Sequence, residues 1–215
     1  MATISKTLIA LNILCLFSTK GFAATQEFPP LPAPVSNNAI TKVITDKDTF
    51  LVSFNGLGPA KSYQSVHNDA YIHKLGDKHW QALSPVPIKE TVNGLSGRLA
   101  SVATSIGNQA YVFGGYTVAK DHSEVSVPDV YAFDVLTKKY TLLAPMTVPV
   151  DDSIALPFKE RYIYLVSGWH NDGNVNLVQV YDIKTNTWQQ ASPFPGKPVF
   201  GHAGGIVDDT MVICD

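Results

Sequence analysis

A six-residue pattern that recurs along this chain constrains its fold more than any other feature of the sequence. Ala110-Tyr-Val-Phe-Gly-Gly115 is matched about fifty residues later by Ile163-Tyr-Leu-Val-Ser-Gly168. Each copy is followed by an alternating segment that ends in Asp, at Asp134 and Asp182, and by an aromatic residue six positions further on. A recurrence at this period indicates an array of one supersecondary unit that is stacked on its own copies.

Two more divergent units flank these copies. The first has an apolar strand at Thr49–Val52, a turn at Asn55-Gly56, and the aromatic residues Tyr71 and Trp80. The fourth covers 201–215, and the sequence stops inside its expected second strand. Val, Ile, Tyr, Phe and Thr dominate the apolar runs, whereas Pro, Gly, Asn and Asp lie between them, so the runs are predicted to be β-strands.

A hydrophobic strand, a glycine pair, a second strand and an aromatic residue form the pattern of one propeller blade. From residue 40 to the end, the chain resembles the kelch-repeat family. The resemblance implies an all-β, kelch-type β-propeller of four-stranded blades, with about three blades and part of a fourth in this chain. Because a propeller ring must close, we expect the N-terminal part of a longer protein of about six or seven blades. A short chain that closes its ring by oligomerising is the alternative.

The glycine pairs and the late aromatic residues are expected to serve packing. Inner strands crowd around a propeller axis, where glycine lets backbones approach and turn without the clash of a Cβ atom. Tyr140 and Trp188, on outer strands, are expected to fill the widening gap between blades.

The N-terminus has the features of a secretory signal peptide. Lys6 precedes an apolar run at Leu8–Phe17, and Gly21-Phe-Ala23 supplies small residues for cleavage after Ala23. The run is too short to span a bilayer, so no membrane anchor is expected. The predicted organisation is a signal peptide at 1–23, a Pro-rich leader at 24–39 and a partial propeller at 40–215. A periplasmic or secreted location follows.

Charge and cysteine content exclude several classes of partner. After cleavage, fourteen basic and eighteen acidic residues remain, a net charge of −4. No cluster of Lys and Arg interleaves with aromatic residues, so no nucleic-acid partner is expected. The one mature cysteine, Cys214, is expected to be a buried, inert thiol. No His/Cys spacing for a metal and no phosphate-binding loop occurs, so no metal site and no cofactor are predicted.

The loops at one end of a propeller, and not its strands, are the place to look for a ligand site. In kelch domains that end is built from the connections between second and third strands and from those between blades. The corresponding segments are Gly56–Asn68, Tyr116–Asp129, Trp169–Asn176, Pro85–Arg98, Pro145–Asp152 and Pro193–His202.

Five residues in these loops are candidate ligand contacts. Arg98, sixteen residues before Gly114, is at a position where kelch domains often carry an arginine, which holds a ligand carboxylate or ties adjacent blades. Trp169, His170 and Asp172 form a loop with an aromatic platform beside polar groups, which suits a sugar but is also ordinary turn chemistry. His202 is either a contact or a hydrogen-bonded blade connector.

Asp151 occupies the third-unit position that the same spacing assigns to Arg98, and Asp152 follows it. Paired carboxylates can serve acid–base chemistry, but two adjacent Asp residues are more often a solvated turn. The turn is the interpretation adopted for this pair.

Three functions fit these observations. The first is a ligand-binding scaffold whose axial face takes a carbohydrate or a protein. The second is a cofactor-independent sugar mutarotase, because the leader, Asp48-Thr-Phe-Leu51 and Gly56-Leu-Gly58 are similar to the bacterial N-acetylneuraminate epimerase family. No catalytic motif of that family can be matched here, so catalytic residues stay unassigned. A copper-radical sugar oxidase fits less well, since that chemistry needs a Tyr–Cys cross-link.

We predict that exported protein begins within a residue or two of Ala24. Small residues at Gly21 and Ala23 fit the signal-peptidase recognition positions. N-terminal sequencing of the periplasmic or secreted fraction checks this, and recovery of the intact N-terminus there would contradict it.

Overall fold

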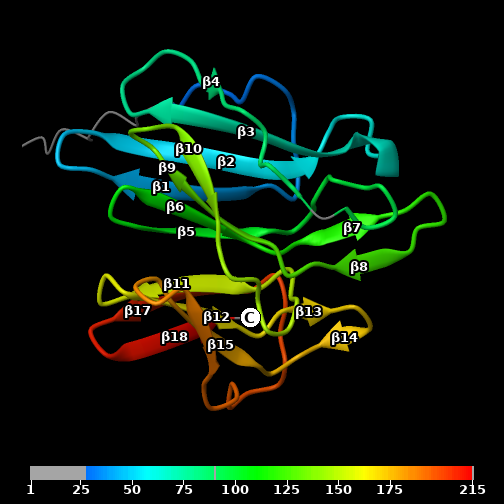
Figure 1. The fold of residues 1–215 in the computed structure, drawn as a ribbon, viewed down its shortest axis with the longest axis vertical. Helices are drawn as coiled ribbons and strands as arrows, with labels where there is room; N and C mark the ends of the chain where they lie inside the picture. Colours follow the sequence, from blue (N-terminus) through cyan, green and yellow to red (C-terminus); the bar gives the residue numbers. More distant parts are fainter. Residues whose placement is uncertain (1–27, 90, 215) are drawn as a thin grey trace, which may run out of the picture.

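The computed structural model describes residues 28–89 and 91–214, which form mainly antiparallel β-strands (Figure 1). One turn of 3-10 helix, η1 (Tyr63–Ser65), interrupts the strands of this described part. The predicted signal peptide at residues 1–23 lies outside the described residues. Within the described ranges, no helix is long and apolar enough to cross a membrane.

Three four-stranded antiparallel sheets follow one another along the chain, and we call them blades 1, 2 and 3. Blade 1 is built from β1 (Ala39–Ile44), β2 (Thr49–Leu57), β3 (Val66–Lys74) and β4 (Gln81–Ala82). Blade 2 is built from β5 (Val102–Ile106), β6 (Gln109–Phe113), β9 (Val130–Asp134) and β10 (Lys139–Leu142). Blade 3 is built from β11 (Ile154–Phe158), β12 (Tyr162–Val166), β15 (Val178–Asp182) and β16 (Thr187–Gln190).

A two-stranded sheet of β17 (Ala203–Val207) and β18 (Thr210–Cys214) begins a fourth blade. The predicted all-β, kelch-type arrangement of three blades and part of a fourth is therefore confirmed. Each four-stranded sheet is antiparallel throughout, so the connections between second and third strands emerge at the same end as the connections between blades.

The first strand of each blade packs on the first strand of the next: β1 on β5, β5 on β11, and β11 on β17. A separate apolar cluster fills each boundary between blades. On β6, Ala110 and Val112 belong to the cluster shared with blade 1, whereas Tyr111 and Phe113 belong to the cluster shared with blade 3. Both faces of this strand are buried, which explains why its sequence is an unbroken apolar run.

The late aromatic residues lie between blades, as predicted. The ring of Trp188 in blade 3 lies 6.0 Å from that of Phe113 in blade 2 and 5.0 Å from Tyr181. Tyr140 in blade 2 lies 6.5 Å from Phe54 in blade 1. Each ring therefore extends the apolar cluster toward the outside of the molecule, where adjacent blades diverge.

A pair of residues with positive φ lies at or near the end of the second strand in every complete blade. The pairs are Asn55-Gly56, Gly114-Gly115 and Ser167-Gly168. The first member has φ of 60°, 52° and 57°, a left-handed value that Asn and Ser tolerate, and the second has φ of 125°, 92° and 107°. A Cβ atom at Gly168 would lie 2.6 Å from the carbonyl oxygen of Asp151. The second position thus requires glycine, whereas the first does not.

Cys214 is exposed, so the prediction of a buried thiol is wrong. It lies on β18, which pairs only with β17 among the described strands. Met211 and Ile213 alternate with it and pack toward blade 3, which leaves Val212 and Cys214 on the other face. An apolar strand sequence therefore did not determine burial here, because burial of that face needs a neighbouring sheet.

We predict that Gly168→Ala destabilises the protein by at least about 1–3 kcal/mol, the range for a side chain held in a disfavoured backbone conformation. The clash with the Asp151 carbonyl adds to this cost. Gly173→Ala is the matched control in the same blade, since no atom lies within 4 Å of the added Cβ and its φ is not positive. Urea unfolding of both variants checks the prediction, and equal midpoints would contradict it.

Candidate functional site

The loop end of the propeller carries two short hairpins that project side by side (right in Figure 1). In blade 2, β7 (Tyr116–Val118) pairs with β8 (Glu124–Ser126), and in blade 3, β13 (Trp169–His170) pairs with β14 (Gly173–Asn174). Each hairpin connects the second and third strands of its blade, directly after the pair with positive φ. The predicted loop segments therefore gather at one end, near the start of the inner strands.

A chain of backbone hydrogen bonds connects the four blades at this end. The N–H of Ala100 donates to the carbonyl of Asn37 (3.1 Å), that of Asp152 to Ala100 (3.1 Å), and that of Gly201 to Asp152 (2.7 Å). Each residue stands two positions before an inner strand and has a left-handed φ, of 52°, 50°, 46° and 61° in chain order. We call Asn37, Ala100, Asp152 and Gly201 the axial arc.

The predicted equivalence of Arg98 in blade 2 and Asp151 in blade 3 is wrong by one residue. Leu99 bridges to Tyr116 in blade 2, and Asp151 bridges to Trp169 in blade 3, so Asp151 corresponds to Leu99. The reason is the turn between the first two strands. Ile106 pairs with Gln109 around two turn residues, whereas Phe158 pairs with Tyr162 around three. One extra residue in blade 3 shifts the count by one.

The predicted solvated turn at Asp151 and Asp152 is wrong for Asp151, which is only 2% exposed. Its Oδ2 accepts a hydrogen bond from the Ser126 hydroxyl at 2.6 Å. The pKa of the Asp151 carboxyl is raised to about 7, mainly by burial; the hydrogen bond from Ser126 lowers it in part, and the nearby carboxyls of Asp152 and Glu124 contribute to the rise. A carboxyl with such a pKa is able to exchange a proton near neutral pH.

Tyr116 connects neighbouring blades at the axial arc. Burial, followed by the acidic side chains of Glu124, Asp152 and Asp151, raises its pKa to about 12. A hydrogen bond with the Asn37 side chain opposes the shift. Burial, followed by Glu124, also raises the pKa of Asp152, which is half-buried. We call Asn37, Tyr116, Glu124, Asp151 and Asp152 the axial polar cluster.

The two hairpins are joined by a reciprocal pair of hydrogen bonds. The Asn171 N–H donates to the Ser126 hydroxyl (3.0 Å), and the Ser126 N–H donates to Asn171 Oδ1 (3.2 Å). Ser126 therefore accepts from blade 3 through its hydroxyl oxygen while its hydroxyl proton goes to Asp151. This arrangement orients Asp151 through residues that the sequence analysis did not select. Only Tyr116 could have been selected from the sequence, because it directly follows Gly115 in the same way that Trp169 follows Gly168.

The hairpin of blade 3 brings together three predicted ligand residues. Trp169 is half-buried, packs against Phe200 (5.7 Å between rings), and donates its Nε1–H to the Asn171 carbonyl. His170 Nδ1 lies 2.7 Å from the Pro149 carbonyl, which only accepts, so Nδ1 carries the proton. Asp172 is exposed at the hairpin tip. Their ligand roles stay predictions.

His202, the fourth predicted contact, is half-buried and directly follows Gly201 of the axial arc. It therefore lies beside the axial arc, directly before the first strand of blade 4, and not in the hairpin of blade 3. Its role as a ligand contact also stays a prediction. Among the described residues, no group of three or more His, Cys, Asp or Glu side chains is arranged to hold a metal ion.

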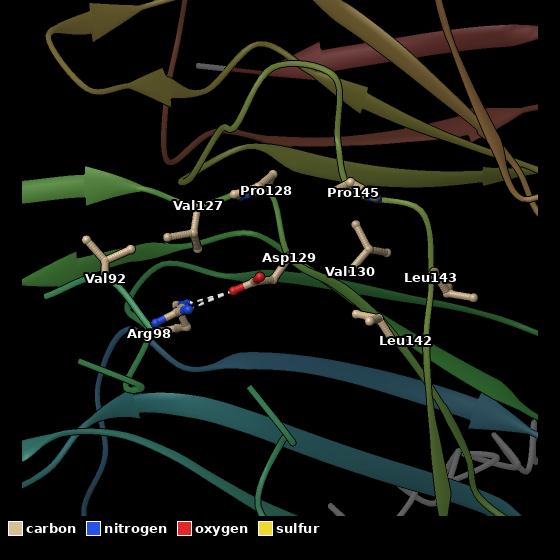
Figure 2. Close-up of a pocket in the computed structure, with 9 residues that line it drawn as sticks. All are labelled: Val92, Arg98, Val127, Pro128, Asp129, Val130, Leu142, Leu143 and Pro145. Atoms are coloured by element: carbon tan, nitrogen blue, oxygen red, sulfur yellow. Dashed lines mark hydrogen bonds and ion pairs between the residues drawn. The ribbon is translucent and has the colours of Figure 1, made fainter. Parts of the chain in front are cut away.

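Arg98 is 1% exposed and its guanidinium faces Asp129 in the same end of the molecule (Figure 2). Its Nε and Nη2 donate to Asp129 Oδ2 at 3.1 and 2.7 Å, and Nη1 donates to the carbonyls of Leu95 and Gly97. These bonds tie the connection between blades 1 and 2 to the start of β9. The geometry favours the structural alternative for Arg98, and its role as a ligand anchor stays a prediction.

A pocket of about 280 Å³ lies beside this ion pair (Figure 2). Apart from the ion pair, its lining is aliphatic: Val92, Val127, Pro128, Val130, Leu142, Leu143 and Pro145. The pocket offers few polar groups to a ligand. The axial polar cluster, which collects acceptors and donors from blades 1, 2 and 3, is therefore the stronger candidate for recognition of a polar molecule.

Comparison with known proteins agrees with the architecture. The family described as KLHDC2/KLHL20/DRC7 Kelch-repeats domain matches residues 5–214. N-acetylneuraminate epimerase from Salmonella arizonae is 24% identical over 97% of this chain and 60% of that protein. Kelch-like protein 15 from Danio rerio is 27% identical over 50% of this chain, and this chain spans 18% of its length.

The fold also resembles a solved structure. YjhT superposes with a TM-score of 0.59 at 18% identity, over 81% of this chain and 57% of that chain. The chain thus spans about three fifths of the epimerase and of YjhT and about a fifth of the Danio rerio protein.

We predict that Arg98→Ala lowers stability by about 3–5 kcal/mol, because it leaves the largely buried Asp129 carboxylate without its partner. Arg161→Ala is the matched control. It breaks the Arg161–Asp182 ion pair, in which the Arg161 side chain is 38% exposed. Because water screens this pair, its loss lowers the free energy of unfolding by less. Chemical denaturation checks both variants. An Arg98→Ala protein of unchanged stability that binds a sugar acid ten- to a hundredfold more weakly would instead establish the anchor role.

Proposed function

The chain belongs to the kelch-repeat family, and on that premise we propose that it forms part of a propeller that binds a carbohydrate at its axial end. The axial polar cluster carries the proposal. Two amide or hydroxyl groups and three carboxyls from blades 1, 2 and 3 lie around the start of the inner strands. Sugar hydroxyls need such converging donors and acceptors, held by a rigid scaffold.

Neighbouring features support a sugar as the ligand. The Trp169 indole, the predicted aromatic platform, lies in the strand that pairs with Asp151. The hydrogen bonds of Ser126 and Asn171 hold both hairpins in place, which lowers the ordering cost of binding. We also propose a periplasmic or secreted location, from the signal-peptide features of residues 1–23.

We propose sugar mutarotation as the activity, with the binding scaffold alone as the alternative. Two observations favour catalysis: the pKa of Asp151 near 7 and similarity to a protein named N-acetylneuraminate epimerase over 97% of this chain. In mutarotation a base takes the anomeric hydroxyl proton, the bond from the anomeric carbon to the ring oxygen breaks, and an acid protonates that oxygen. Closure on the opposite face reverses these transfers, so the reaction needs no oxidant or reductant.

We expect the protein to bind N-acetylneuraminate and to accelerate exchange between its anomers. Calorimetric titration measures the binding, and exchange spectroscopy by NMR measures the rate against the same solution without protein. Binding without acceleration would leave the scaffold function and remove the mutarotase. Neither binding nor acceleration, with N-acetylneuraminate or with neutral N-acetylated hexoses, would contradict the carbohydrate proposal.

A further inference from the structure

The connection between blades 1 and 2 is longer than the connection between blades 2 and 3. Val86 and Met146 are equivalent starting points, since the N–H of each bonds to the third-strand region of its own blade. Leu99 follows Val86 by thirteen positions, whereas its counterpart Asp151 follows Met146 by five. Insertions in one repeat of an array map to the loops of one face, which is often the binding face. The first connection is therefore a place to look for a second site.

Arg98 holds part of this longer connection in a defined shape. Val92 and Leu95 exchange backbone hydrogen bonds of 3.3 and 2.9 Å around Asn93-Gly94, whose φ values of 51° and 79° are those of a tight hairpin turn. We call Val92–Leu95 the inserted hairpin. Arg98 Nη1 donates to the Leu95 carbonyl (3.3 Å), while Nε and Nη2 donate to Asp129. One buried guanidinium thus fastens the inserted hairpin to the start of β9.

The aliphatic pocket of about 280 Å³ lies between the inserted hairpin and blade 2. Figure 2 shows Val92 and Arg98 on one side of it and Leu142 and Leu143 on the other. Val130, also in its lining, is fully buried, whereas Leu142 is 45% exposed and marks the rim. Sites for drug-sized ligands enclose roughly 300–1,000 Å³. The pocket is just below this range, so it suits one compact apolar group.

The polar wall of this pocket favours a neutral donor. Both Arg98 hydrogen bonds to Asp129 go to Oδ2, and the Asp129 side chain keeps 13% exposure, so Oδ1 is left for a donor inside the pocket. The Arg98–Asp129 pair has no net charge. A charged ligand would lose its hydration among aliphatic side chains without an opposite charge to compensate. An uncharged N–H or O–H group beside an alkyl group meets both conditions.

A sugar ring does not match this chemistry, because it presents hydroxyls on all sides and the described lining offers neither an aromatic platform nor many polar groups. A leucine or isoleucine residue combines a branched alkyl group with an adjacent backbone N–H. We propose that the pocket binds an aliphatic side chain of a polypeptide partner, whose backbone N–H donates to Asp129 Oδ1. This site is separate from the axial polar cluster and does not depend on the proposed carbohydrate function.

The test titrates the full chain with N-acetyl-leucine methylamide and follows the methyl resonances of Val127 and Val130, both in the pocket lining, by NMR. We expect saturable shifts of both. N-acetyl-glycine methylamide lacks the alkyl group and binds about tenfold more weakly or worse. A leucine probe methylated on its own nitrogen has lost the donor to a carboxylate, which also weakens binding by roughly tenfold or more.

Two variants locate the binding of the leucine probe. Leu142→Asp puts a charge on the rim and weakens binding by about tenfold or more. Leu136→Asp is the matched control, because Leu136 is 57% exposed in the turn at the opposite end of the same blade, and it leaves the affinity unchanged. Val92→Ala removes apolar contact from the other wall and weakens binding severalfold. Thermal unfolding of each variant separates binding from folding.

The outcomes decide between a polypeptide and other ligands. Equal affinity for the leucine and glycine probes, or no saturable shift with either, overturns the proposal. Unchanged binding by a folded Leu142→Asp protein, or an equal loss in Leu136→Asp, overturns it as well. Tighter binding of N-acetylmannosamine than of the leucine probe, with shifts at the same methyl groups, assigns the pocket to a sugar and rejects the polypeptide.

Discussion

The hydrogen bonds of the axial arc are the interaction on which the rest of this structure depends. Blades 2, 3 and 4 each give one N–H to the preceding blade through a residue with a left-handed backbone, and three of the four residues of the arc carry a side chain. That conformation costs about 1–2 kcal/mol per residue outside glycine. Burial of apolar side chains between the blades offsets it. The arc thereby sets how closely the inner strands approach and which side chains reach the axis.

The chemistry of the axial end follows from this spacing. Asp151 and Asp152 are adjacent in sequence, but the arc turns the backbone between them, so one carboxyl is buried and the other stays half-buried. Loss of hydration favours the protonated form of both. Ser126 and Asn171, from different hairpins, hold the buried carboxyl in one orientation. A carboxyl whose pKa burial raises to about 7 thus lies at the end of the propeller where we propose that a sugar binds.

The repeat made the scaffold predictable, because its signals are local. The glycine near the end of each second strand, the apolar run of β6 after Gln109 and the late aromatic Trp188 each report a packing requirement of the blades. The site was less predictable. Counting sixteen residues back from the glycine pair placed Asp151 with Arg98, and one extra turn residue in blade 3 made that count wrong. The length of such a turn cannot be recognised from composition or hydropathy.

The sequence by itself determined the all-β class, the period of the blades and the positions that require glycine, since these follow from strand propensity and backbone sterics within one unit. Only the tertiary structure decided which polar groups meet. Arg98 forms an ion pair with Asp129 inside the scaffold, Asp151 is buried and accepts a hydrogen bond from Ser126, and Cys214 is exposed on β18. Each outcome depends on a neighbouring strand, hairpin or blade. The physical reason is that burial and pairing arise between residues distant in sequence, through the lengths of the turns that bring them together.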